Sequence, residues 1–163
     1  GCNSFADALD FSSPRSARTS QPGLISVHGP LLALLRGSTF SLVVEVEGLD
    51  RSIQRVDLIG SDLGVLLARS HDGALYSPLA SGLTCAPIEP AAWHQRRRCA
   101  LSVDRPQSMV AIAVSGARSE RRSGTAPTAD GLVVSAGSNG GRIVRITGYA
   151  HFLDGRAIDE LLA

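Results

Sequence analysis

Apolar and polar side chains alternate most clearly over residues 39–47, TFSLVVEVE. Because successive side chains of a strand point to opposite faces, this alternation predicts a half-buried β-strand. We expect most of the later runs of similar length to be its partners in one domain. The apolar face of this strand consists of Phe40, Leu42, Val44 and Val46, and Ser41, Glu45 and Glu47 lie on the polar face.

Shorter runs of strand-forming residues, bounded by turn residues, continue along the chain. Further strands are predicted at 23–28, 53–59, 63–68, 74–79, 99–104, 108–116, 132–136 and 142–149. The Asn139-Gly140 pair predicts a hairpin between the last two of these strands. The runs 53–59 and 63–68 also predict a hairpin.

Three segments differ from the rest in the side chains they carry. In 108–116, Ala111 and Ala113 oppose an apolar face, which predicts a central strand covered on both sides. The segment 117–130 is polar and interrupted by proline, which predicts an exposed loop. In 154–163, Asp154 can cap a short helix whose apolar side carries Ile158, Leu161 and Leu162.

Strands separated by turns about every 8 to 12 residues are typical of a β-sandwich. At this level the chain resembles an immunoglobulin-like or fibronectin-III-like domain, although it lacks the Cys, Trp, Cys spacing of antibody domains. The counted runs, together with this resemblance, predict an all-β, antiparallel β-sandwich of about seven to nine strands. The cap and apolar side of 154–163 add a short C-terminal helix. We expect the sandwich to span 23–153 and the helix or tail to span 154–163.

Length and composition fit one domain with a sizeable core. The chain has 163 residues, of which 44% are hydrophobic, and its net charge is +1. Such a balance provides no overall field that would attract nucleic acid, so nucleic acid is not an expected partner. The sequence also contains no apolar run of about 18 residues that would indicate a membrane-spanning helix.

The first residues suggest a cellular location. Gly1-Cys2 resembles the end of a bacterial lipobox, in which a small residue precedes the cysteine that receives a lipid. The resemblance implies lipidation at Cys2, a membrane anchor and a location in the cell envelope, at the outer membrane or the cell surface. An ordinary free thiol or a cloning remnant is the alternative. Residues 1–22 then form a tether, in which 5–11 could make one helical turn or dock on a partner. Other envelope proteins in a multi-subunit assembly are the expected partners.

Cys85 and Cys99 are the first and last residues of a 15-residue segment rich in proline. In an exported protein they would most simply form a disulfide, which removes about 3 kcal/mol of unfolded-chain freedom in the entropy model. Two separate buried thiols are the alternative. Metal binding by these cysteines with His94 lacks a fourth ligand at a recognisable spacing, so no metal site is predicted.

Within that segment, an aromatic ring precedes three successive cations. Such a mixture is typical of a contact patch for anionic lipid headgroups, an acidic polysaccharide or an acidic protein face. The alternative is a solvated loop in which Trp93 covers the end of the core. The possible partner-contact residues are Trp93, His94, Arg96, Arg97 and Arg98.

Nothing in the sequence indicates catalysis or a cofactor. Ser70-His71-Asp72 places the residue types of a catalytic triad side by side, where they cannot converge on one reacting atom. The glycines after Ala136 lack the Lys and Ser/Thr of a phosphate loop. We therefore expect a non-enzymatic envelope lipoprotein with a structural or assembly role. The alternatives are an extracellular carbohydrate or surface-ligand binding module and, third, a hydrolase with a non-obvious site.

Overall fold

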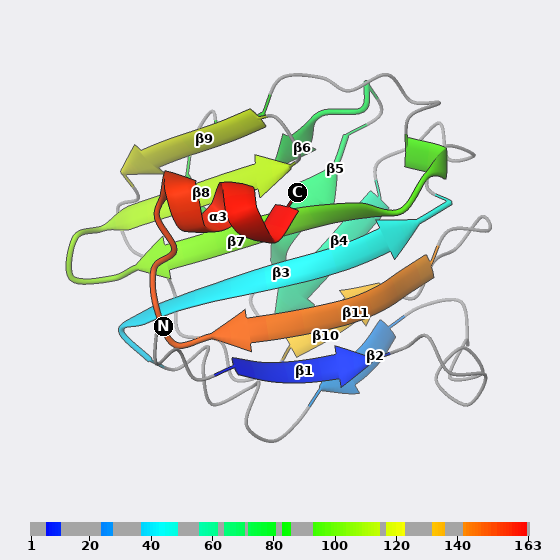
Figure 1. Ribbon diagram of the computed structural model, residues 1–163, viewed down its shortest axis with the longest axis horizontal. Coiled ribbons are helices and arrows are strands. Elements are labelled where there is room, and N and C mark those ends of the chain that lie inside the picture. The colour runs from blue at the N-terminus through cyan, green and yellow to red at the C-terminus, as the bar shows by residue number, and fades with distance from the viewer. Residues whose placement is uncertain are drawn as a thin grey trace.

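The computed structural model describes residues 6–10, 24–27, 37–48, 56–61, 64–70, 72–80, 83–85, 93–114, 117–122, 132–135 and 142–162. These residues form eleven strands and the helix α3 (Gly155–Leu162) (Figure 1). The strands are β1 (Ala6–Asp10), β2 (Leu24–Val27), β3 (Thr39–Glu47), β4 (Val56–Ser61), β5 (Gly64–Arg69), β6 (Leu75–Tyr76), β7 (Arg97–Asp104), β8 (Met109–Val114), β9 (Ala117–Arg122), β10 (Leu132–Ser135) and β11 (Arg142–Tyr149).

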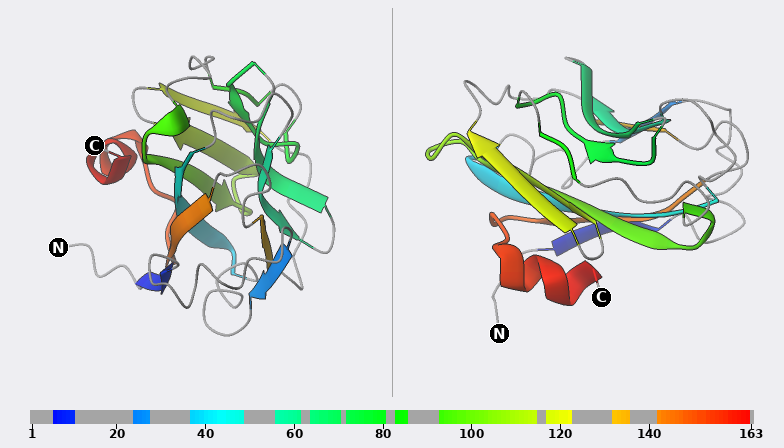
Figure 2. Two further views of the ribbon diagram at one scale, coloured as in Figure 1. Left: turned by 90° about the vertical axis from the view of Figure 1, so that its right-hand side faces the viewer. Right: turned by 90° about the horizontal axis from the view of Figure 1, so that it is seen from above.

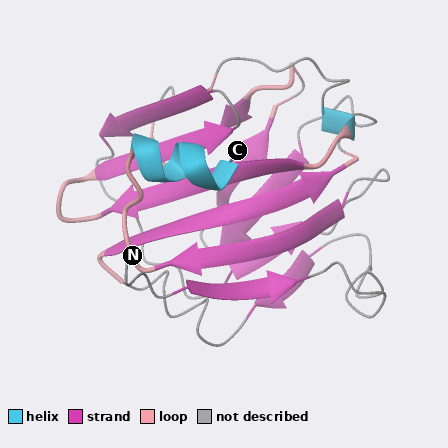
Figure 3. Ribbon diagram, in the orientation of Figure 1, coloured by secondary structure: helices cyan, strands magenta, loops and turns pink. Residues whose placement is uncertain are grey.

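The strands form two antiparallel sheets that face each other. One sheet has six strands in the order β1-β11-β3-β7-β8-β9, and the other has five in the order β2-β10-β4-β5-β6. Figure 2 shows the two layers edge-on, with α3 on the side of the six-stranded sheet that faces away from the second sheet. Figure 3 shows how little of the described chain is helical. The predicted all-β, antiparallel β-sandwich with a short C-terminal helix is confirmed, but the described residues form eleven strands instead of the expected seven to nine, because β1 and β9 were not predicted as strands.

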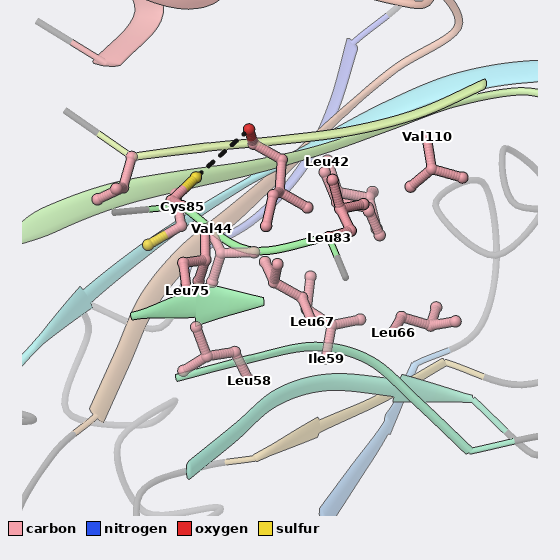
Figure 4. Close-up of a cluster of buried hydrophobic side chains, with 14 of the residues drawn as sticks. Leu42, Val44, Leu58, Ile59, Leu66, Leu67, Leu75, Leu83, Cys85 and Val110 are labelled. Atoms are coloured by element: carbon pink, nitrogen blue, oxygen red, sulfur yellow. Dashed lines mark hydrogen bonds between the residues drawn. The ribbon is translucent and has the colours of Figure 1, made fainter. Parts of the chain in front are cut away.

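The main core lies between the sheets. The apolar face of β3 predicted from the alternation is buried there, with Leu42, Val44 and Val46 fully inaccessible. Leucines and Ile59 from β4 and β5 approach from the other sheet (Figure 4). Burying such side chains contributes roughly 1.5–3 kcal/mol each, so this layer dominates the stability of the sandwich.

A second, smaller apolar cluster covers the opposite face of the six-stranded sheet, which we call the outer face. Small residues there, Ala100 and Ala113, let α3 pack close to the strands. Ile158 and Leu162 of the helix are buried against them. Asp154 caps the helix, because its carboxylate accepts a hydrogen bond from the Ala157 amide at 2.9 Å. The amphipathic helix and the doubly covered strand β8 are therefore both confirmed.

Three local predictions are wrong. The segment 6–10, placed in a tether that could make a helical turn, is the edge strand β1, paired with β11. Residues 117–122, predicted as part of an exposed loop, form β9 on β8. The strands β10 and β11 do not form a hairpin, since they belong to different sheets. The residues that join them, 136–141, lie outside the described part of the chain.

Candidate binding pocket on the outer face

A pocket of about 140 Å³ lies on the outer face, beside the C-terminal end of α3. Three neighbouring strands, β11, β3 and β7, provide its floor, and α3 provides one wall. We call it the outer-face pocket. It is lined by Val43, Glu45, Arg98, Arg145, Thr147, Tyr149 and Leu161.

Strand register explains why these side chains meet. Glu45 on β3 pairs with Arg145 on β11 and with Arg98 on β7, so the three form one row across the sheet. Two residues along β3, Val43 pairs with Thr147 in the next row. Residues in one row of adjacent strands have side chains about 5 Å apart, which keeps this cluster compact.

An irregularity in β11 contributes to the row. The pairing of β11 with β3 shifts between Ile143 and Arg145, where two residues of β11 correspond to one step on β3. Such a bulge changes which side chains point to a given face. After it, Arg145, Thr147 and Tyr149 share one face, and Ile146 between them is buried in the core.

The charged groups of the pocket hold one another in place. The guanidinium Nε of Arg98 lies 3.6 Å from Glu45 Oε1, and Arg96 Nη1 lies 3.9 Å from the same oxygen. The Glu45 side chain is only 13% exposed, whereas that of Arg98 is 46% exposed. Two arginines and one carboxylate are among the lining residues, and Asp10 on β1 pairs with Arg145 at the end of the same row.

Arg98 also contacts α3. Its Nη1 donates a hydrogen bond to the carbonyl oxygen of Leu161 at 3.1 Å, in the last turn of the helix. A cation at this position satisfies a helix-end carbonyl and interacts favourably with the helix dipole. One side chain therefore joins the pocket row to the helix that forms its wall.

The structure buries one residue of the predicted contact patch and leaves most of the others at the surface. Trp93 is fully buried and donates a hydrogen bond from Nε1 to the Gly73 carbonyl at 3.0 Å, so its predicted role in partner contact is wrong. Trp93 belongs to the core, as the alternative proposed, and residues 86–92 of its loop lie outside the described part of the chain. His94, Arg96 and Arg98 are exposed, and Arg97 is half-buried. Arg96 lies 3.4 Å from Glu47 as well as near Glu45, so acidic partners within the chain offset part of the positive charge.

Cys85 and Cys99 are buried free thiols in the structure, in the same core cluster, so the predicted disulfide is not formed. Cys85 donates a weak hydrogen bond from Sγ to the Ile112 carbonyl at 3.6 Å (Figure 4). Burial raises the pKa of Cys85 to about 11 and that of Cys99 to about 12. Both thiols are therefore neutral at physiological pH, which opposes metal binding and nucleophilic chemistry.

The remaining described candidates are not among the residues that line the pocket. Cys2 and His71 lie outside the described residues. Ser70 and Asp72 hydrogen-bond to each other, and Asp72 also accepts from the Ala74 amide, so this pair builds a turn. The described residues contain no group of three or more potential metal ligands, and no described helix has the length and apolarity needed to cross a membrane.

Sequence reasoning singled out one lining residue, Arg98, and placed Glu45 on a solvated face. The missed signal is the polar alternation of Arg145, Thr147 and Tyr149, which lies on the strand next to Glu45. Such a signal becomes informative only when the neighbouring strands are known.

Comparison with known proteins gives similarity in fold only. No protein-family model and no curated protein matches the chain by sequence. Two solved structures of the Ruminococcus gnavus IT-sialidase CBM40, bound to α2,3 and α2,6 sialyllactose, are each 13% identical. Each match covers 97% of this chain. It covers 92% of the α2,3 structure with a TM-score of 0.57, and 93% of the α2,6 structure with a TM-score of 0.58. Trypanosoma rangeli sialidase is 15% identical with a TM-score of 0.56, but the chain covers only 23% of its length.

Proposed function

We propose that this domain is a non-catalytic carbohydrate-binding module whose ligand occupies the outer-face pocket. The observation that carries the proposal is the row Arg145, Glu45, Arg98, set beside Thr147 and Tyr149 on an open sheet. A sugar presents hydroxyl groups that both donate and accept hydrogen bonds, and this row offers guanidinium donors together with a carboxylate acceptor. Tyr149 adds an aromatic ring with a polar tip.

The charges favour an acidic sugar. Arginine presents a planar fork of donors that matches a carboxylate, and two guanidiniums outnumber the one carboxylate of the pocket. A volume of about 140 Å³ is smaller than the roughly 300–1,000 Å³ of sites that enclose a whole small molecule. We therefore expect the pocket to take one terminal sugar, with the rest of the glycan lying over the open sheet.

The similarity to the CBM40 structures supports this proposal because they match nearly their full length and their ligand is sialyllactose. The sialidases match over a small part of their length. Sialic acid carries a carboxylate, so sialylated glycans are the first ligands to test. Uronic acids provide the same charge from another sugar class.

The pocket geometry favours binding over hydrolysis. Most glycosidases use two carboxyl groups that flank the scissile bond, and Glu45 is the sole carboxylate among the described residues that line this pocket. Tyr149 pairs with Ser41, which lies four residues from Glu45 on β3. At the rise of a strand, this separates Tyr149 from Glu45 by about 13 Å along the strand direction. A tyrosine nucleophile would need its carboxylate base within hydrogen-bond reach.

Isothermal titration calorimetry tests the proposal directly. We expect 3′- or 6′-sialyllactose or glucuronic acid to bind, with binding weakened by salt, and lactose to bind at least tenfold more weakly. Arg145→Ala should weaken binding by about 10- to 100-fold, since a hydrogen bond to a charged group contributes about 1.5–3 kcal/mol. Arg156→Ala is the matched control, because the Arg156 side chain is 91% exposed on α3 and outside the pocket. No heat with any of these sugars, or equal binding by both variants, would overturn the proposal.

We also propose, as a separate point, that the module is exported and anchored through a lipid at Cys2, in keeping with the Gly1-Cys2 pair. Intact mass of the native protein tests this, because an acyl adduct adds several hundred daltons to the chain. An unmodified mass would rule out the anchor and would not affect the pocket.

A further inference from the structure

The helix α3 contributes to the outer-face pocket in two ways. Leu161 lines the pocket directly, and its backbone carbonyl holds Arg98, which also lines the pocket. On its other side, α3 is attached to the sheet by Ile158 and Leu162, which are buried against Val43, Ala100 and Ala113. The position of the helix therefore fixes both an apolar wall and the placement of a guanidinium.

This helix depends on docking for its structure. It has eight residues, and isolated helices shorter than about 12 residues are marginal in water. Its stability must come from the apolar contacts, the Asp154 cap and the Arg98 hydrogen bond. If α3 leaves the sheet, the pocket loses Leu161 as a wall and Arg98 loses its carbonyl partner.

We infer that α3 is the specificity-determining wall of this pocket, and that helix docking and ligand binding stabilise each other through Leu161 and Arg98. This inference rests on the proposed function. Two equilibria that share residues are reciprocally coupled, so a ligand that binds the docked form more tightly shifts the helix toward docking by the same factor. Ile158, which faces the sheet and does not line the pocket, then affects affinity without touching the ligand.

Two measurements on the full chain test this, with 3′-sialyllactose as the probe. In wild type, saturating sugar should slow hydrogen exchange of the amides of residues 159–162 at least threefold. In calorimetry, Leu161→Ala should weaken binding roughly 5- to 10-fold, the factor expected for losing a partly buried aliphatic contact. Ile158→Ala should weaken binding by at least threefold, with faster exchange in α3.

Glu160→Ala is the control on the same helix, because the Glu160 side chain is 73% exposed, and its affinity should stay within twofold of wild type. If Leu161→Ala does not fold, Leu161→Met retains the volume and tests the shape of the wall, with an expected change in preference between 3′- and 6′-sialyllactose. Sugar binding with unchanged α3 exchange, or wild-type affinity in both Leu161→Ala and Ile158→Ala, would overturn this inference and leave the proposed function intact. Absence of binding in wild type would overturn both.

Discussion

The hydroxyl groups of Ser41 and Ser102 lie 2.7 Å apart, buried at the centre of the outer face. Ser41 Oγ also donates to the His151 carbonyl at 2.6 Å and accepts from the Leu153 amide at 3.1 Å. Because a serine hydroxyl has a single proton, Ser102 must donate to Ser41. This serine therefore attaches the segment before α3 to the middle of the sheet.

Ser41→Ala should destabilise the domain by about 1–3 kcal/mol, because the buried Leu153 amide loses its acceptor. Ser102→Ala should cost less, since Ser41 keeps both of its backbone partners. Urea unfolding gives the free energy of each variant, with the exposed Ser38→Ala as control. Equal effects of all three substitutions would contradict the role of Ser41.

The buried tryptophan gives a second prediction. The chain contains a single tryptophan, so intrinsic tryptophan fluorescence reports on Trp93 alone. We expect native emission shifted to short wavelength and resistant to quenching by iodide, both lost in urea. Trp93→Phe should cost about 1–3 kcal/mol, because the Gly73 carbonyl loses its donor. Strong quenching in the native state would instead restore Trp93 to the surface patch.

The thiols predict how stability depends on pH. In the folded state burial raises the pKa of Cys85 to about 11 and that of Cys99 to about 12, from the ordinary value of 9.0 for a cysteine thiol. Between about pH 9 and pH 11 the unfolded chain has released both protons and the folded chain retains them, and Cys99 retains its proton up to about pH 12. The free energy of unfolding should therefore fall as pH rises, by up to about 1.4 kcal/mol per pH unit for each thiol, and should be unaffected by these groups below pH 9.

Unfolding in urea at several pH values between 7 and 11 measures this slope. Cys99→Ala should reduce the slope above pH 9, which separates the thiols from other groups that titrate there. Alkylation with iodoacetamide should be slow in the native protein and complete in urea. Mass mapping that finds Cys85 joined to Cys99 would contradict the reduced pair and restore the disulfide predicted from the sequence.

Much of the fold follows from local patterns. Alternation placed β3, the small residues of β8 indicated a strand covered on both sides, and Asp154 marked the start of α3. These predictions succeeded because each depends on burial or capping within a few residues. They identify elements and say little about partners.

The failures involve partners that lie far apart in the sequence. Asn139-Gly140 has the chemistry of a tight hairpin, but the strands on either side of it belong to opposite sheets. The edge strand β9, ARSERR, has no apolar alternation, and charged side chains of this kind are common on edge strands, where they oppose edge-to-edge pairing. The pocket combines residues 43, 45, 98, 145, 147, 149 and 161, and local patterns do not show which strands are adjacent.

The pairing of β1 with β11 has a mechanical consequence. Ala6, at the start of β1, is opposite Tyr149, at the end of β11. The first residue of β1 and the last residue of β11 therefore lie at the same end of this strand pair. Tension applied through the two ends of the chain would first pull α3 from the sheet. It would then separate β1 from β11 one residue pair at a time. In this loading direction only a few hydrogen bonds of an antiparallel ladder share the force at once.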